Sequence, residues 1–183
     1  MNVHVPQRMT VDEFLIWSLQ QEKGRYELQD GLVIMQQAQN WAHLRVKGRI
    51  YRLLLAAIER AGVAYYVAPD GATVRIGPRT AYEPDALVAP LPVPNDDALE
   101  IPNPVIVVEV LSPSSVKRDL ADKVAGYFKV ASIAHYLVLD PVEKEIIWHR
   151  RAAAGGLEPP LSMKEALGLD PPGIDLDVAE VFA

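Results

Sequence analysis

Hydrophobic positions in the first third of the chain follow helical spacing, then strand alternation, then helical spacing again. Residues 10–20 have the periodicity of a short amphipathic helix, and its start has the spacing of a capping box. Residues 25–37 alternate around Gln29-Asp30-Gly31, which predicts a β-hairpin. Residues 41–61 carry the longest helical pattern, and Gly62 is a natural stop for that helix.

Beyond Gly62 the apolar runs shorten to the length of strands. Strands are expected over residues 63–68, 72–76, 85–89, 105–111, 136–139 and 145–149. The first two flank a predicted turn at Asp70-Gly71. The run over residues 105–111 is apolar at almost every position, which is typical of a central strand covered on both faces.

The remaining segments connect these strands or follow them. Residues 90–104 contain five prolines and predict a loop, whereas residues 116–130 predict a helix. Residues 161–167 suggest a helical turn, and residues 174–182 alternate enough to dock along the core. This order of elements predicts one α/β domain over residues 1–183, with a central mixed sheet flanked by helices.

Composition narrows the environment and the partners. The chain has no cysteine, which excludes disulfides and thiolate zinc sites and fits a reducing cytoplasm. Apolar runs fall far short of the ~20 residues that a membrane span requires, so no membrane partner is expected.

The net charge of −6 is unfavourable for non-specific DNA binding, which depends on clustered cations. The local basic residues are Arg45, Lys47, Arg49 and Arg52 in one segment and Lys117 and Arg118 in another. Solvated helix faces are the simpler interpretation of both groups.

Two carboxylates stand in or beside segments that otherwise have the composition of buried strands. Glu109 lies within the run over residues 105–111, where a carboxylate is costly unless it is paired or binds a metal. Asp85 follows Pro84 and begins an earlier strand, so the two acids converge if the strands pair. Mg²⁺ favours one or two carboxylates with waters and phosphate oxygens, and such a site can hydrolyse phosphodiesters. Taken alone, Asp85 could be a turn residue at the end of a strand, which is the commoner role of an aspartate after proline.

These residues resemble a known group of proteins. Pro84-Asp85 with Glu109-Val110-Leu111 is similar to the PD-(D/E)xK restriction-endonuclease-like superfamily, except that Leu111 occupies the position of the superfamily lysine. A longer set of residues resembles one branch, the Uma family of bacterial restriction endonucleases, formerly a domain of unknown function. The residues of that set are 25–31, His43, 109–115, Asp119, Lys123 and Tyr127, within a similarity that spans roughly residues 10–150.

The resemblance implies a restriction-endonuclease-like core and a Mg²⁺- or Mn²⁺-dependent endonuclease that hydrolyses DNA, as a homodimer because cutting two strands needs two sites. It also implies that the catalytic lysine has migrated to the following helix. The implied site residues are Asp85, Glu109 and Lys123 as catalytic residues, Asp85, Glu109 and Glu27 as metal ligands, and His43, Asp119 and Tyr127 as neighbours. Four-residue spacing puts Asp119, Lys123 and Tyr127 on one helix face.

Simpler structural interpretations stand beside these roles. Lys123 could pair with Asp119 on a solvated helix face, and Glu27 could be an exposed hairpin residue. Ser112, Ser114 and Ser115 are expected to cap the helix, because a serine nucleophile would need an oriented histidine. The tryptophans interpreted as packing residues rather than base-stacking platforms are Trp17, Trp41 and Trp148.

Two other functions remain open. A nuclease fold that no longer cleaves and serves as a binding or regulatory module is favoured by Leu111 and by the acidic net charge. A glycosidase with two catalytic carboxylates ranks third, because such acids rarely accompany this lysine and no aromatic-lined sugar cleft is evident from the sequence.

Overall fold

The computed structural model describes residues 8–111 and 117–183, with only the backbone described for residues 117–119. Its helices are α1 (Val11–Ser18), α2 (Trp41–Ala61), α3 (Lys117–Tyr127) and α4 (Val178–Phe182). Its strands are β1 (Tyr26–Gln29), β2 (Leu32–Met35), β3 (Tyr65–Pro69), β4 (Val74–Gly77), β5 (Thr80–Tyr82), β6 (Ala86–Pro90), β7 (Ile106–Val110), β8 (His135–Asp140), β9 (Glu145–Arg150), β10 (Leu161–Met163), β11 (Ala166–Leu169) and β12 (Ile174–Asp177).

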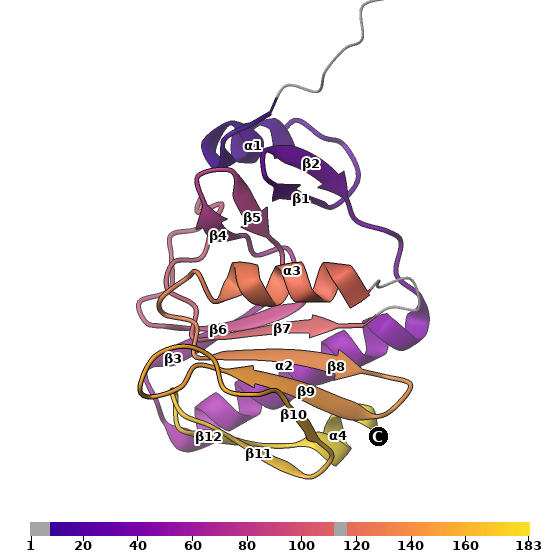
Figure 1. Cartoon of the computed structure of the whole chain (residues 1–183), viewed down its shortest axis with the longest axis vertical. Coiled ribbons are helices and arrows are strands. Elements are labelled where there is room, and N and C mark those ends of the chain that lie inside the picture. Colours follow the sequence, from indigo (N-terminus) through magenta and orange to yellow (C-terminus); the bar gives the residue numbers. More distant parts are fainter. Residues whose placement is uncertain (1–7, 112–116) are drawn as a thin grey trace, which may run out of the picture.

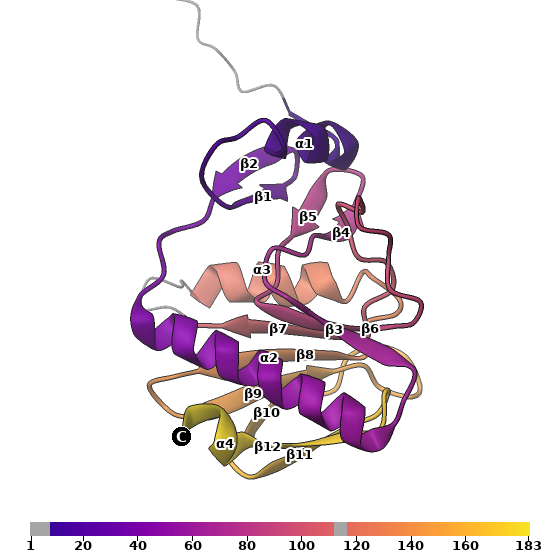
Figure 2. The ribbon, with the colours of Figure 1, turned by 180° about the vertical axis from the view of Figure 1, so that it is seen from behind.

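The largest sheet has six strands in the order β10-β9-β8-β7-β6-β3. The central strands β7 and β8 are parallel, and the other neighbours are antiparallel. Helix α2 covers one face of this sheet and α3 the other, as the two opposite views show (Figures 1 and 2). The apolar composition of β7 follows from this position, because both of its faces are buried.

Each face of the sheet has its own hydrophobic core. On the α2 side, Ile50 and Leu54 pack with Val108 and other alternate strand residues. On the α3 side, Val107 and Tyr127 belong to a second cluster of buried residues. The period-two alternation of β7 thus sends successive side chains into opposite cores, and Glu109 shares the α3 side with Val107.

A four-stranded sheet of order β2-β1-β5-β4 lies on the α3 side of the molecule, with α1 beside it (Figure 1). The β1–β2 hairpin turns at Asp30 and Gly31, whose φ angles of 50° and 84° are those of a tight hairpin turn. Phe14 of α1 and Leu28 of β1 share a third buried cluster. This packing fixes β1, which carries Glu27, above α3.

Most of the predicted elements are confirmed. The mixed sheet flanked by helices, the hairpin over 25–37 and the helix over 41–61 ending at Gly62 are all present. The segments over 63–68 and 72–76 correspond to β3 and β4, but these strands belong to different sheets. The start of the helix predicted from residue 116, and its serine cap, lie outside the described residues.

The prediction for residues 161–167 is wrong. Strands β10 and β11 replace the helical turn, because Leu167 and Leu169 are buried while Ala166 and Gly168 are exposed. That alternation has the period of a strand. The short strand β5 is not apparent in the sequence pattern, since three residues are too few to establish a period.

Candidate functional site

Strand pairing brings the two predicted carboxylates together. β6 and β7 are antiparallel with Ala86 opposite Val108, and the amide of Asp85, just before β6, donates to the same Val108 carbonyl at 2.8 Å. Asp85 therefore lies beside β7, where its negative charge adds to burial in raising the pKa of Glu109. Asp85 also accepts a 2.7 Å hydrogen bond from the amide of Val110 through Oδ2, which fixes its carboxylate against β7.

Helix α3 supplies the cation and a hydroxyl to Glu109. Lys123 Nζ lies 2.8 Å from Glu109 Oε1, and the Tyr127 hydroxyl donates to the same oxygen at 2.7 Å. Lys123 and Tyr127 are one helical turn apart, so both reach the sheet from the same helix face. The Tyr127 ring is fully buried and lies edge-on to Tyr82, with ring centroids 5.2 Å apart.

Glu27 joins the cluster from the smaller sheet. Its Oε1 atom lies 3.0 Å from Lys123 Nζ and accepts a 3.0 Å hydrogen bond from the amide of Glu83. Glu27 is buried, so the alternative interpretation of this residue as an exposed hairpin residue is wrong. Lys123 thus bridges two carboxylates that come from different sheets.

A second lysine serves Asp85 from the opposite helix. Lys47 Nζ on α2 lies 2.7 Å from Asp85 Oδ1 and 2.7 Å from Asp70 Oδ2, and it donates to Gln39 Oε1 at 3.0 Å. His43, one turn earlier on α2, places Nε2 3.4 Å from Asp85 Oδ2. We call Glu27, Asp85, Glu109, Lys47 and Lys123 the charged cluster.

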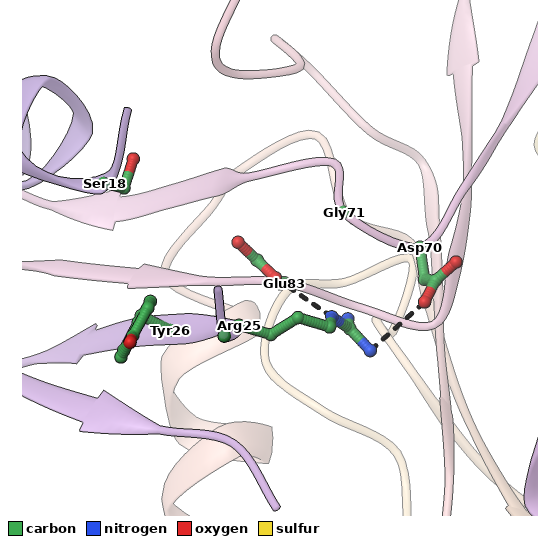
Figure 3. A pocket seen from close by; sticks show the side chains of 7 residues that line it. Ser18, Arg25, Tyr26, Asp70, Gly71 and Glu83 are labelled. Atoms are coloured by element: carbon green, nitrogen blue, oxygen red, sulfur yellow. Dashed lines mark ion pairs between the residues drawn. The ribbon is translucent and has the colours of Figure 1, made fainter. Parts of the chain in front are cut away.

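A pocket of about 360 Å³ lies beside the charged cluster, and Arg25, Tyr26, Asp70 and Glu83 are part of its lining (Figure 3). The Arg25 guanidinium spans it, with Nη1 3.1 Å from Asp70 and Nε 3.4 Å from Glu83. Asp70 also binds Lys47, and the Glu83 amide binds Glu27. The pocket wall therefore connects the two halves of the charged cluster through ion pairs and one hydrogen bond.

Burial and nearby charges shift the pKa values of Glu109 and Asp85 in opposite directions. Burial, partly opposed by the ammonium of Lys123, raises the pKa of Glu109 to about 7. Burial would also raise the pKa of Asp85, but His43 and Lys47 together lower it to about 2. Burial disfavours the charged form of Lys123, yet Glu109 and Glu27 outweigh this effect and hold its pKa above the ordinary value. Lys123 is therefore an ammonium at neutral pH, and strongly perturbed acids of this kind are typical of functional sites.

The structure brings together six of the seven residues singled out in the sequence: Glu27, His43, Asp85, Glu109, Lys123 and Tyr127. The side chain of the seventh, Asp119, lies outside the description, so its pairing with Lys123 stays a prediction. Among the described residues, no three His, Asp or Glu side chains are grouped so as to hold a metal ion. The role of Glu27 as a third metal ligand likewise stays a prediction.

Sequence reasoning missed Lys47 and misjudged Trp41. Lys47 belongs to a basic run that suggested a solvated face, but it is buried, whereas Arg45 and Arg52 are exposed. Lys47 could have been predicted from its position four residues after His43, because residues at that spacing lie on the same face of a helix. The packing role expected for Trp41 is wrong, since this side chain is 76% exposed.

The layered sheet and its cluster of acids and lysines define a protein of the restriction-endonuclease-like α/β class. A sequence model of the Uma2 family, described as "putative restriction endonuclease", matches residues 11–179. The chain therefore belongs to the Uma2 family, and the resemblance inferred from the sequence is confirmed.

A solved structure agrees with this assignment of the fold. The crystal structure of "a putative nuclease belonging to DUF820" from Anabaena variabilis ATCC 29413 superposes with a TM-score of 0.75 at 16% identity. The superposition covers 95% of this chain and 97% of that chain. A search of curated proteins gives no match. Within the described residues, no helix is both long and apolar enough to cross a membrane.

Proposed function

We propose that the protein is a metal-dependent endonuclease that hydrolyses phosphodiester bonds of DNA at the charged cluster. The observation that carries the proposal is the 2.8 Å contact between Lys123 on α3 and Glu109 on β7, next to Val110, whose amide binds the Asp85 carboxylate. Leu111 cannot supply an ammonium, and Lys123 supplies one to the same carboxylate from the helix. Asp85, Glu109 and Lys123 are thereby brought together, although the residue two positions after Glu109 is a leucine.

The residues present fit a Mg²⁺ or Mn²⁺ ion held by Asp85 and Glu109. Mg²⁺ needs only one or two carboxylates, with waters and substrate oxygens completing its shell. The Nε2 atom of His43 lies 3.4 Å from Asp85 Oδ2, whereas its buried Nδ1 atom lacks a hydrogen-bond partner among the described residues, which favours a further polar group beside His43. A bound divalent ion would polarise the phosphodiester and promote deprotonation of the attacking water.

The protein's own side chains have distinct roles in this proposal. Lys123 stays charged, so it neutralises negative charge developing on the phosphoryl oxygens rather than acting as a base. Tyr127 and Glu27 are positioning residues: the hydroxyl of Tyr127 holds Glu109, and Glu27 holds the ammonium of Lys123. Lys47 keeps Asp85 ionised and oriented from α2.

The decisive experiment is nicking of supercoiled plasmid DNA by the purified protein with Mg²⁺, with Mn²⁺ and with EDTA. Wild type is expected to nick with either metal and not with EDTA. Glu109→Gln, Asp85→Asn and Lys123→Met should each lower the rate by about 10²-fold or more, as for the loss of one group that stabilises transition-state charge. Lys129→Met is the matched control, because Lys129 is exposed just beyond α3.

Two results would count against the proposal in different ways. Cleavage that survives Glu109→Gln would place the activity outside the charged cluster or in a contaminant. DNA binding without cleavage under any metal would instead support the alternative, a nuclease fold that serves as a binding or regulatory module. The acidic net charge and Leu111 are the features that favour this second function.

The proposal includes a homodimer, since cutting both strands requires two sites. The feature that supports it is β2, which is the outer strand of the four-stranded sheet and exposes Leu32, Ile34 and Met35. An exposed apolar edge strand is suited to pairing with another chain. Light scattering should report a dimer for wild type and a monomer for Ile34→Lys, and a wild-type monomer would overturn this part.

A further inference from the structure

The outward side of α2 has a composition unlike the rest of the chain. Trp41, Arg45, Arg49 and Arg52 follow one another at intervals of three or four residues, which puts them within about 80° of one another around the helix. Trp41, Arg45 and Arg52 are exposed and Arg49 is half-buried. We call these four residues the α2 stripe. Figure 2 views α2 from this outward side, with no other labelled element drawn across it.

The α2 stripe is a local concentration of positive charge on an acidic protein. From Trp41 to Ile58, α2 contains no Asp or Glu, although the chain as a whole carries a net charge of −6. Among the described side chains, none of its three arginines has a carboxylate within ion-pair distance, whereas Arg25, Lys47 and Lys123 are each paired with acids. The stripe cations therefore remain available to an external anion.

Trp41 adds a large aromatic surface at the end of the stripe nearest the charged cluster. Its 76% exposure contrasts with the 8% exposure of Trp148. Trp41 precedes His43 by two residues and Lys47 by six, and these two side chains contact Asp85 from the inward face of the same helix. One helix thus presents the charged cluster on one side and an aromatic residue followed by arginines on the other.

We infer that the α2 stripe is a contact surface for nucleic acid, with Trp41 stacking on a base and the three arginines binding backbone phosphates. Charge complementarity favours this occupant, because guanidinium groups bind phosphate bidentately and stack well. From Arg45 to Arg52 the helix rises about 10 Å, which matches about three steps between successive phosphates at their axial spacing of ~3.4 Å per strand. The inference rests on the proposed function and adds to it the surface that holds the substrate outside the site of cleavage.

The test compares two triple variants with the same change of net charge. Arg45→Glu, Arg49→Glu and Arg52→Glu remove the stripe cations, and Lys23→Glu, Lys129→Glu and Lys144→Glu are the control at exposed lysines elsewhere. Binding of a fluorescein-labelled DNA 20-mer, duplex or single-stranded, is measured by anisotropy in EDTA over a range of salt concentrations. The stripe variant should lose about tenfold or more in affinity, and the slope of log K against log salt should fall by about two to three. The control should keep the wild-type slope.

Trp41 is tested separately because stacking is not a charge effect. Trp41→Ala should weaken binding of the single-stranded 20-mer by at least about fivefold with the salt slope unchanged, because an unpaired base is free to stack, and Trp41→Phe should restore most of the affinity. The glutamine triple at Arg45, Arg49 and Arg52 provides a second test if the glutamate triple fails to fold. Its slope should fall in the same way.

The outcomes separate this inference from the proposed function. If wild type cleaves DNA but the stripe and control triples bind equally, the inference is wrong and the proposed function stands. If the stripe variant loses binding to heparin but not to DNA, the surface serves another polyanion and the inference is again wrong. A wild type that neither binds nor cleaves DNA overturns both.

Discussion

Replacing Lys123 by methionine removes an ammonium from the charged cluster while keeping an unbranched side chain of similar length. In the wild type, burial raises the pKa of Glu109 to about 7, and the charge of Lys123 opposes that rise. Without Lys123 the pKa of Glu109 must rise further. Each pKa unit corresponds to about 1.4 kcal/mol of differential stability.

The sign of the effect on stability follows from linkage. An acid whose folded pKa exceeds its unfolded value of 4.5 destabilises the folded state progressively as pH rises toward the folded pKa. At pH 6 Glu109 is largely protonated in both proteins. At pH 8 it is largely ionised in the wild type, whereas in the variant ionisation of Glu109 costs more free energy because its pKa is higher. The loss of unfolding free energy should therefore be about 1–3 kcal/mol greater at pH 8 than at pH 6.

Thermal unfolding followed by circular dichroism measures this difference. For a chain of this length, 1 kcal/mol corresponds to roughly 2–4 °C in Tm. Lys129→Met, at an exposed position, should show the same Tm change at both pH values. Equal destabilisation by Lys123→Met at pH 6 and pH 8 would refute the argument, because it would mean that Lys123 does not control the ionisation of Glu109.

Three further predictions concern the same site. Lys47→Met should lower Tm more at pH 7 than at pH 3. The folded pKa of Asp85 is about 2 and its unfolded value is 3.8. Ionised Asp85 therefore stabilises the fold fully at pH values above 3.8, and this contribution is lost as pH falls through about 2. Gly126→Ala should cost about 1–3 kcal/mol in chemical denaturation, because its Cβ would lie 2.6 Å from Tyr82, the ring that packs against Tyr127; an unchanged midpoint would exclude that clash. Adding Leu111→Lys to Lys123→Met should recover at least about tenfold in single-turnover cleavage, since Leu111 shares a strand face with Glu109, and no recovery would show that the ammonium must approach from α3.

The elements that sequence predicted well are those in which local pattern and tertiary environment agree. Helix α2 has a continuous apolar face, an asparagine N-cap and Gly62 in the left-handed conformation, so each local signal supports the same boundaries. The prediction of a helical turn over residues 161–167 was wrong because β10 forms a strand only through its pairing with β9. Such pairing depends on partners distant in sequence, and a three-residue strand carries no independent signal.

The same distinction applies to the site. Glu109 was predictable because a carboxylate within an apolar strand is costly without a partner. Lys47 was not, because the sequence around it is that of an exposed basic helix, and only the fold shows that it points inward to Asp85 and Asp70. For Trp41 the prediction was wrong in the opposite direction. An aromatic residue at the start of a helix suggests packing, yet no described part of the chain buries this side chain.

The topology explains how a lysine 14 residues beyond the glutamate can replace one that is two residues beyond it. β7 and β8 are parallel neighbours, so the chain between them must cross one face of the sheet, and α3 makes that crossing. Glu109 projects from this same face, as its contacts with α3 show. The helix face that packs on the sheet repeats every three to four residues, so Tyr127, buried in the core, brings Lys123 one turn earlier to the end of β7. The position of the ammonium is thus determined by the crossover between two parallel strands, and the chemistry requires its place in space rather than its place in the sequence.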